Sequence, residues 1–425
     1  MDLHLNDSAM AIDLIHVSDI HFGSGEGHGR INPTTGLNIR FEDFVHSLEK
    51  VVDYALENKA DIFLFSGDAY KTANPQPIYQ KMFARELNRL SRAGIPTVLV
   101  VGNHDQILKS TQSHSLSVFQ SLEVPGLTII DQPSSCRIMT AKGPVQLIGL
   151  PHITRNNLMT LEKYRELSAG QIDSVLVSHV DQLLQGFYQD LDPAVPTVVT
   201  AHMSVDRAVA GIEEELLVGY TLTFPTDIFV HPSIDYVALG HIHKYQVIRE
   251  EKPAIVYAGS LDRVDFGEAK EDKGFVHVKL ERGSTSFEFH SVDPRPFIMV
   301  EIDLREKTEP TKLLREAVAK KVIPGCVLRV RYKIEQENIQ SVDEKDVLLE
   351  ASQCLSVRLQ AEVIPSRSRA RMPQLTESSV LSPISALDTY LDEIAPENKE
   401  RLLERAREVI SKVSAELHEG GSVDN

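Results

Sequence analysis

Short apolar runs alternate with amphipathic stretches over the first 290 residues. The apolar runs predict strands over residues 11–17, 62–66, 97–101, 146–150, 174–178, 197–200 and 236–239. Helical spacing of apolar residues predicts helices over residues 40–58 and 78–93, the second of them closed by Gly94. Buried runs that alternate with helices indicate an α/β or layered sandwich domain.

The chain then passes a stiff joint, Asp293-Pro294-Arg295-Pro296, into a region with a new pattern. Strands are predicted over residues 297–304, 326–332 and 356–364, and helices over 311–321 and 343–354. These elements suffice for a small separate domain. We therefore expect a first domain over residues 1–292, a small α+β domain over 295–365, a linker over 366–380 and a helical segment over 381–419.

The final helical segment carries an apolar stripe at helical spacing. Its members are Leu387, Leu391, Ile394, Leu402, Leu403, Ala406, Val409, Ile410, Val413 and Leu417. Such a stripe packs either on its own domain or in the groove of a partner. Because the segment follows a predicted linker, we favour docking onto a partner.

Composition narrows the class of protein. The 44 basic and 61 acidic residues give a net charge of −17, which argues against binding nucleic acid through bulk positive charge. A nucleic-acid enzyme stays compatible with this charge, because bound divalent cations or a basic partner can invert the local field. Three scattered cysteines predict buried structural thiols and a reducing compartment. No window predicts a membrane span, and residues 1–10 do not resemble a secretory signal, so we expect a cytoplasmic protein.

Polar residues follow five of the apolar runs at the point where each run ends. They are Asp19, His21, Asp68, Asn103, His104, His202, His241 and His243. In α/β architectures, functional sites form at the edge beyond the carboxyl ends of the strands. Any one of these residues alone is more often a cap, a turn former or a hydrogen-bonded polar group. Five such elements in order point to one shared site.

The residue types and their spacing predict a metal centre. Asp19 and His21 lie two residues apart, as do His241 and His243, so in extended geometry each pair points the same way. Carboxylate and imidazole ligands together suit Mn²⁺, Fe²⁺ or Zn²⁺. Seven ligands are too many for one ion and suit two ions that share a bridging carboxylate. Two such ions can clamp the attacking and leaving oxygens of a phosphoryl transfer.

The five elements resemble the pattern of the calcineurin-like metallophosphoesterases, which is DxH, GD, GNH(D/E), H and GHxH. The resemblance implies a four-layer α/β/β/α sandwich with a small α+β capping domain and a C-terminal helical segment. It assigns the metal ligands as follows: Asp19, His21, Asp68 and His243 hold one ion, and Asn103, His202 and His241 complete the second, with Asp68 bridging. His104 is then the catalytic histidine near the scissile phosphate. Asp105 is either its orienting partner or the N-cap of the next helix.

The resemblance extends to the family's double-strand-break repair nucleases. It implies an Mn²⁺-dependent DNA nuclease, with Mg²⁺, Fe²⁺ or Zn²⁺ as other candidate ions. The expected activities are 3′→5′ exonuclease on duplex ends and endonuclease on single strands or hairpins. The expected partners are DNA and a coiled-coil ATPase, with a homodimer inside a heterotetramer. Two alternatives stay open: a phosphodiesterase acting on cyclic nucleotides or other small phosphoesters, and a non-catalytic scaffold for a repair ATPase.

A few residues depart from the family pattern or lie beside it. Lys71 stands where the nucleases often have an acidic or imidazole group, and Arg30 lies in a long glycine-rich loop over residues 22–38. Both are candidate DNA contacts, against the alternatives of a solvated lysine and a mobile lid. The basic run at Arg367, Arg369 and Arg371 is either a solvated linker or a contact to DNA phosphate or a partner.

Overall fold

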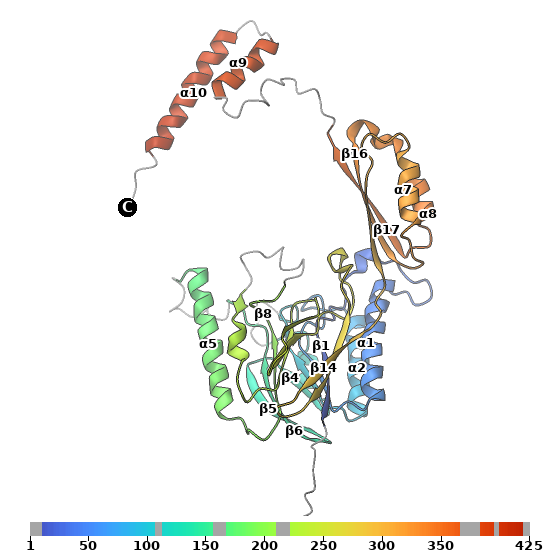
Figure 1. Cartoon of the computed structure of the whole chain (residues 1–425), viewed down its shortest axis with the longest axis vertical. Helices are drawn as coiled ribbons and strands as arrows, with labels where there is room; N and C mark the ends of the chain where they lie inside the picture. Colours follow the sequence, from blue (N-terminus) through green and yellow to red (C-terminus); the bar gives the residue numbers. More distant parts are fainter. Residues whose placement is uncertain are drawn as a thin grey trace, which may run out of the picture. The chain divides into compact units, whose positions relative to one another are not determined.

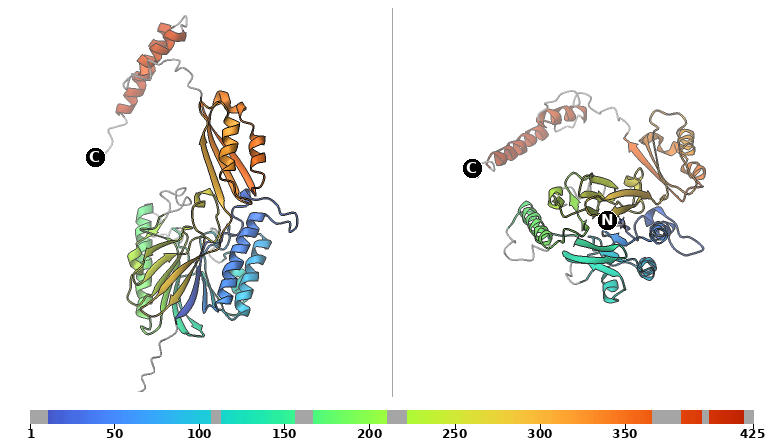
Figure 2. Two further views of the ribbon diagram at one scale, coloured as in Figure 1. Left: turned by 45° about the vertical axis from the view of Figure 1, so that its right-hand side comes forward. Right: turned by 60° about the horizontal axis from the view of Figure 1, so that its bottom comes forward.

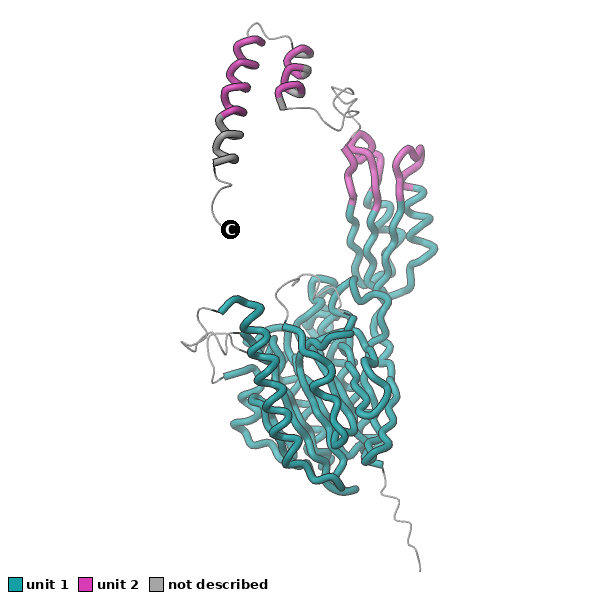
Figure 3. The backbone as a smooth tube through the Cα atoms, turned by 60° about the vertical axis from the view of Figure 1, so that its left-hand side comes forward, with its two compact units in different colours: residues 1–302, 312–331, 344–360 teal, residues 303–311, 332–343, 361–425 magenta. Residues whose placement is uncertain are grey.

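The computed structural model describes residues 11–106, 113–155, 167–209, 222–365, 383–394 and 399–419. The chain forms two compact units (Figures 1 and 3). The first unit comprises residues 1–302, 312–331 and 344–360, and the second comprises residues 303–311, 332–343 and 361–425. The domain boundaries at 292/295 and 365 and the 366–380 linker stay predictions, and residues 366–382 lie outside the described residues.

Two six-stranded mixed sheets form the centre of the first unit (Figure 2). The order of the first sheet is β14-β13-β1-β2-β3-β4, and that of the second is β11-β12-β10-β7-β6-β5. The first sheet consists of β1 (Ile12–Val17), β2 (Ile62–Phe65), β3 (Thr97–Val100), β4 (Leu127–Ile130), β13 (Gly274–Leu280) and β14 (Ser286–Ser291). The second consists of β5 (Ser134–Thr140), β6 (Gly143–Leu150), β7 (Thr197–His202), β10 (Tyr236–Gly240), β11 (Gln246–Arg249) and β12 (Ala254–Tyr257).

Alternation along the strands divides the apolar core into layers. In β2, Ile62 and Leu64 face the second sheet, where Val198 of β7 belongs to the same cluster. Phe63 and Phe65 face the opposite way and join the cluster that contains the helices α1 (Ile39–Glu57) and α2 (Pro77–Arg92). The outer face of the second sheet packs against α5 (Ala169–Gln189). The predicted four-layer α/β/β/α sandwich is confirmed.

The predicted strand over residues 174–178 is wrong, because this segment lies inside α5. A short apolar run such as Ser-Val-Leu-Val-Ser fits a strand or a helix equally well when it is read alone. The longer window shows helical spacing, with Ile172, Leu176, Val180 and Leu184 all buried. Ser168 begins the helix through a capping box with Gln171.

Short elements connect the strands of the two six-stranded sheets. They are α3 (Ser117–Ser121), the 3-10 helices η1 (Glu26–His28), η3 (Thr226–Phe229) and η4 (Phe266–Glu268), and the small pair β8 (Ser204–Val205) and β9 (Thr223–Phe224). The 22–38 loop, which contains η1, is anchored at several points. The ring of His28 contacts Phe266 and Phe297, and its carbonyl accepts a hydrogen bond from Ser356. Arg30, at the outer side of this loop, is exposed.

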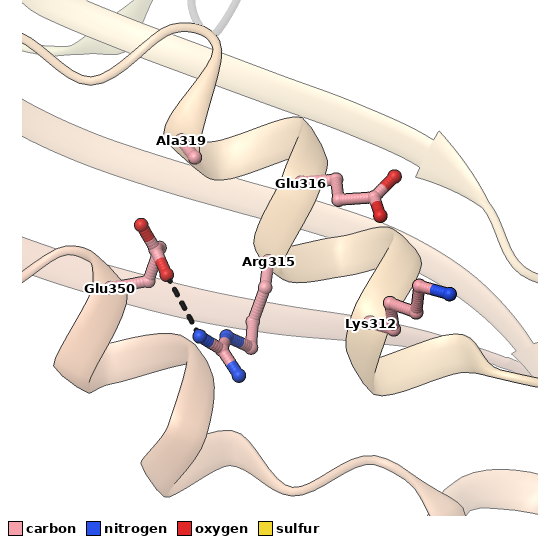
Figure 4. Close-up of a pocket in the computed structure, with 5 residues that line it drawn as sticks. All are labelled: Lys312, Arg315, Glu316, Ala319 and Glu350. Atoms are coloured by element: carbon pink, nitrogen blue, oxygen red, sulfur yellow. Dashed lines mark hydrogen bonds and ion pairs between the residues drawn. The ribbon is translucent and has the colours of Figure 1, made fainter.

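A third sheet, of order β15-β16-β17, follows the proline joint, as predicted. Its elements are β15 (Phe297–Asp303), β16 (Val327–Glu335), β17 (Ser356–Ile364), α7 (Pro310–Ala319), α8 (Glu344–Glu350) and the 3-10 helix η5 (Gln336–Ser341). Arg315 of α7 pairs with Glu350 of α8 at 3.1 Å, beside a shallow hollow that Lys312 also lines (Figure 4). The hollow contains none of the predicted site residues.

A buried ionic network joins the start of this third sheet to α1. The Arg40 side chain is fully buried and pairs with Asp43 at 2.6 Å and Asp262 at 2.8 Å. Asp43 also accepts two hydrogen bonds of 2.6 Å from Arg295, which in turn donates to the Gly325 carbonyl. Such a network stays stable only while every charge keeps its partner.

The second unit contains the two C-terminal helices, α9 (Pro383–Ile394) and α10 (Lys399–Glu419). Leu391 and Leu403 are buried, and Lys399 pairs with Asp388 at 2.7 Å. Leu402 and Val409, members of the predicted stripe, stay exposed. Among the described helices, none combines the length and apolar character that crossing a bilayer requires.

His16 lies in β1 between the two sheets, fully buried, and its Nδ1 lies 3.1 Å from the Tyr236 hydroxyl. Burial disfavours the charged imidazole and lowers the pKa of His16 to about 3. Between pH 6.5 and 3, the unfolded chain therefore binds a proton at this residue that the folded chain does not bind. Stability is lost as the pH falls through this window.

We expect the His16→Asn variant to lose less stability on acidification than the wild type. The difference should approach about 1.4 kcal/mol per pH unit below pH 6.5, since one proton separates the two states. Urea unfolding at pH 7.5 and pH 5 measures it. The exposed His46→Asn variant is the control and should keep the wild-type dependence on pH. Equal dependence in His16→Asn and wild type would contradict the prediction.

Candidate metal centre

The carboxyl ends of β1, β2, β3, β7 and β10 deliver all the predicted metal ligands to one end of the sandwich. Asp19 and His21 follow β1, Asp68 follows β2, and Asn103 follows β3. His202 ends β7, and His241 and His243 follow β10 in the second sheet. The site therefore takes ligand candidates from both sheets.

The first group of candidates is deeply buried. His21 Nε2 lies 3.7 Å from Asp19 Oδ1 and 3.5 Å from Asp68 Oδ2. The same nitrogen lies 2.9 Å from His243 Nε2. Potential ligand atoms of Asp19, His21 and His243 all lie within 4.8 Å of one another, which is compatible with a single ion.

The second group shares Asp68 with the first. His202 Nε2 lies 3.2 Å from Asp68 Oδ2 and 3.0 Å from Asn103 Oδ1. His241 Nδ1 lies 3.0 Å from the same Asn103 oxygen. The Nδ1 of His202 donates to the Ser66 carbonyl at 2.7 Å, which leaves Nε2 as a ligand atom. Asp68 lies where a bridging carboxylate would be needed.

The donor set fits two divalent cations. The Nδ1 of His243 donates to a carboxylate, so its Nε2 presents a lone pair toward His21. His21 Nε2 and His243 Nε2 lie 2.9 Å apart, close enough for both nitrogens to bind a single ion. The clusters, which mix carboxylate and imidazole, imply a dimetal site. The seven individual ligands stay predictions.

Charge balance holds Asp68 ionised despite complete burial. Burial raises the pKa of this carboxyl, but His202, His21 and His104 lower it by more, so that it stays well below its ordinary value. Burial lowers the pKa of His202, but Asp68 and Asp19 raise it by more, to about 9. Buried negative charge at this position therefore attracts positive charge, whether from protons or from metal ions.

The loops that present the ligands adopt unusual backbone conformations. Asp19, His21 and Asp68 have φ between 51° and 63°, and His241 has φ 102°. Such values cost energy and persist only where the surroundings hold them. The loops after β1 and β2 continue to pair, with Asp19 N–H donating to the Gly67 carbonyl and His21 N–H donating to the Asp68 carbonyl.

At two positions of the motifs, the backbone lies so close to a ligand candidate that only glycine fits. A Cβ at Gly102 would lie 2.1 Å from Asp68 Oδ1. A Cβ at Gly67 would lie 2.2 Å from His202 Nδ1, and Gly67 also has φ 104°. Glycine thus lets the backbone approach the ligand side chains directly.

Asp105 contacts the loop that carries Asp68, an arrangement that neither predicted role includes. Its Oδ2 accepts the backbone N–H groups of Asp68 at 3.0 Å and Gly102 at 3.1 Å, and its Oδ1 accepts the Ser115 hydroxyl at 2.7 Å. The His104 ring is instead oriented by the Lys71 carbonyl, which lies 2.9 Å from Nδ1. The oxygens of Asp105 accept hydrogen bonds from the Asp68 loop and from Ser115, and no hydrogen bond to the His104 ring is among them. The capping alternative concerns residues 107–112, outside the described residues.

His104 differs from the ligand candidates because its side chain is exposed. Its backbone N–H donates to Asp68 Oδ1 at 2.9 Å, and its ring contacts that of His21 edge-on at 4.8 Å between centroids. With Nδ1 engaged by the Lys71 carbonyl, Nε2 is available to a substrate. The Lys71 side chain is exposed and the structure gives it no site contact among the described residues.

Two neighbours of the ligand candidates lie outside the motifs that the sequence predicts. The buried Glu268 accepts a hydrogen bond of 2.7 Å from His243 Nδ1. His152, which matches no ligand position of the family pattern, lies beside His241 with ring centroids 5.5 Å apart, and its Nδ1 lies 3.3 Å from the His202 carbonyl. His152 ends an apolar run, which is a usable signal. Glu268 belongs to no motif, so only the fold reveals it.

A family model described as calcineurin-like phosphoesterase matches residues 12–245, more than half of the chain. The chain belongs to this family. Its fold, its family and the buried clusters of His and Asp together define a metal-dependent phosphoesterase. The third sheet and the C-terminal helices lie beyond the matched region.

The chain is also similar, at low sequence identity, to two curated DNA repair proteins or nucleases. The chain is 26% identical over 315 residues to the DNA double-strand break repair protein Mre11 of Archaeoglobus fulgidus, covering 68% of this chain and 61% of that protein. It is 24% identical over 276 residues to the SbcD subunit of the nuclease SbcCD of Escherichia coli K12, covering 62% and 64%. Both matches thus span less than two thirds of the relative. A dimetal phosphatase from Danio rerio matches 67% of this chain and 98% of its own at 11% identity and a TM-score of 0.41.

We expect the chain to bind two Mn²⁺ ions and the Asp68→Asn variant to lose at least about 100-fold in affinity, since changes outside the ligand shell already cost 10–100-fold. Titration calorimetry measures this, and Mn²⁺ should raise the unfolding temperature of the wild type. The matched control is Asp61→Asn, because Asp61 is a buried carboxylate just before β2, paired with Lys142. Wild-type binding by Asp68→Asn would refute the bridging role.

Proposed function

We propose that this protein is an Mn²⁺-dependent DNA nuclease of the SbcD type, with 3′→5′ exonuclease activity on duplex ends and endonuclease activity on single strands and hairpins. The observation that carries the phosphodiesterase chemistry is the pairing of two buried metal-ligand clusters with the exposed, oriented His104. DNA as the substrate is supported by the similarity to Mre11 and to the SbcCD nuclease. A role in DNA repair, recombination and replication follows from the same similarity.

Two bound cations would activate water and neutralise charge that develops on the phosphoryl oxygens. Asp19, His21, Asp68 and His243 would hold one cation, and Asp68, Asn103, His202 and His241 the other. His104 would hydrogen-bond the scissile phosphate through Nε2 and supply a proton to the departing 3′-oxygen. The Lys71 carbonyl accepts the Nδ1 proton of His104, so the ring would need a second proton on Nε2, as the imidazolium, to donate to the departing oxygen.

Arginines near the third sheet support a polyanionic substrate. The Arg329 guanidinium stacks 4.0 Å over the Phe266 ring. Burial lowers the pKa of Arg329, and the charges of Arg358 and Arg331 lower it further. Asp265 raises the pKa of Arg329, and Arg331 pairs with Glu301 at 3.6 Å, so acidic groups of the chain offset part of this positive charge. The three arginines are candidate contacts to a phosphate backbone. Arg30 and Lys71 stay further candidate contacts to DNA.

The proposed partner is a coiled-coil ATPase of the SbcC type, in a heterotetramer built on a homodimer of this chain. Support comes from the similarity to the SbcCD nuclease and from the exposed Leu402 and Val409 of α10, which suit helix-in-groove docking. The basic run at Arg367, Arg369 and Arg371 lies outside the described residues and stays a candidate contact.

The nuclease proposal is tested with the full chain, Mn²⁺ and end-labelled duplex, hairpin and single-stranded circular DNA, alongside bis-p-nitrophenyl phosphate. We expect DNA cleavage, with shortening from the 3′ ends. Turnover of the small ester alone would favour the phosphodiesterase alternative and remove the nuclease proposal. Full metal binding with no turnover of either substrate would favour the scaffold.

His104→Asn is expected to lower the turnover number on DNA by at least about 100-fold, the usual contribution of a general acid, while Mn²⁺ affinity stays at the wild-type level. Steady-state kinetics and calorimetry on the same preparation separate the two effects. His46→Asn, an exposed histidine of α1, serves as the control. Parallel loss of metal binding and turnover would instead make His104 a ligand.

A further inference from the structure

The last turn of η4 places a buried carboxylate against a candidate metal ligand. Glu268 is 5% exposed, and its Oε1 accepts the Nδ1 proton of His243 at 2.7 Å. This hydrogen bond leaves His243 Nε2 as the nitrogen that faces His21, 2.9 Å away. Without a partner for Nδ1, the His243 ring could rotate or adopt the other tautomer.

Glu268 is itself held rigidly by a second set of contacts. Its Oε2 accepts the backbone N–H of Val264 at 2.9 Å and pairs with Lys273 Nζ at 3.0 Å. Lys273 is fully buried, and the same ammonium donates to the His243 carbonyl at 2.9 Å. Side chain and backbone of His243 are thus fixed by one pair of opposite charges.

The other end of η4 packs on the third sheet. Phe266 shares an apolar cluster with Phe297, Val327 and Leu355, which lie in or beside β15, β16 and β17. Phe266 and Glu268 are the first and last residues of the three-residue η4, so this short element contacts both the apolar cluster and the candidate ligand His243.

We propose that Glu268 is a positioning residue of the metal centre, which acts through His243 by fixing its tautomer and its ring orientation. This inference rests on the metal site of the proposed function and names a residue outside the family's ligand motifs. Carboxylates behind a ligating histidine orient the ring and increase its basicity as a ligand. Glutamine at this position would keep the shape but turn an amide N–H₂ toward the donors Lys273 or Val264, or toward His243 itself.

The test compares Glu268→Gln with Glu271→Gln. Glu271 is a matched control because its carboxylate also pairs with Lys273, at 2.8 Å, whereas the Nδ1 proton of His243 goes to Glu268. Mn²⁺ stoichiometry and affinity are measured by calorimetry, and Co²⁺ absorption spectra report ligand geometry. We expect Glu268→Gln to weaken one of the two Mn²⁺ sites by about 10–100-fold and to alter the Co²⁺ spectrum. Glu271→Gln should keep wild-type affinity and spectrum.

A double-mutant cycle with His243→Ala separates positioning from a general structural effect. If Glu268 acts through His243, Glu268→Gln costs no further affinity once His243 is alanine. Additive losses, or wild-type Mn²⁺ binding by Glu268→Gln, would overturn the proposal. Should Glu268→Gln fail to fold in the circular dichroism control, Glu268→Asp takes its place, with an intermediate loss expected.

Metal binding is measured without DNA, so the test of Glu268 does not depend on whether DNA is the substrate. A chain that binds both ions but cleaves only small phosphoesters would remove the nuclease and keep the role of Glu268. A wild-type chain that binds no Mn²⁺ would overturn the role of Glu268.

Discussion

The site depends on one charged group, the Asp68 carboxylate, held without solvent between two clusters of imidazoles. A buried negative charge is costly unless it is paired, and here the pairing groups come from both sheets. Several other features of the site support this carboxylate. Gly102 leaves room for its oxygen, and Asp105 holds its backbone N–H. Strained backbone at Asp68 is tolerated because these contacts determine it from several sides.

The carboxylates of Asp68 and Asp105 lie close to one another, and this proximity changes the pKa of Asp105. Burial, and then the charge of Asp68, raise the pKa of Asp105 to about 6. Three hydrogen bonds to backbone N–H groups and one to a hydroxyl offset part of this cost. Asp105 therefore supports the loop that carries Asp68, the predicted bridging carboxylate.

Much of the fold and of the site could be predicted from sequence, for identifiable reasons. Parallel strands deliver their carboxyl ends to one edge, so residues following β1, β2 and β3 meet regardless of their separation in the chain. The DxH and GHxH pairs reach the site as expected, but Asp19, His21 and His241 have positive φ and not the extended geometry that the spacing predicted. Glu268 could not be predicted, because it reaches His243 across 25 residues through a fold-dependent turn. Residues 174–178 were predicted as a strand although they lie inside α5, because a run of five residues is too short to distinguish helical from strand spacing.

Because both sheets supply ligand candidates, the metal site can form only late in folding. His21 belongs to one sheet and His243 to the other, and they meet only after the two halves of the sandwich have docked. A nascent chain interrupted before β10 lacks His241 and His243, two of the seven predicted ligands. Binding of the implied metal pair would therefore come late in folding and would link the two sheets, so metal removal is expected to loosen this end of the sandwich first.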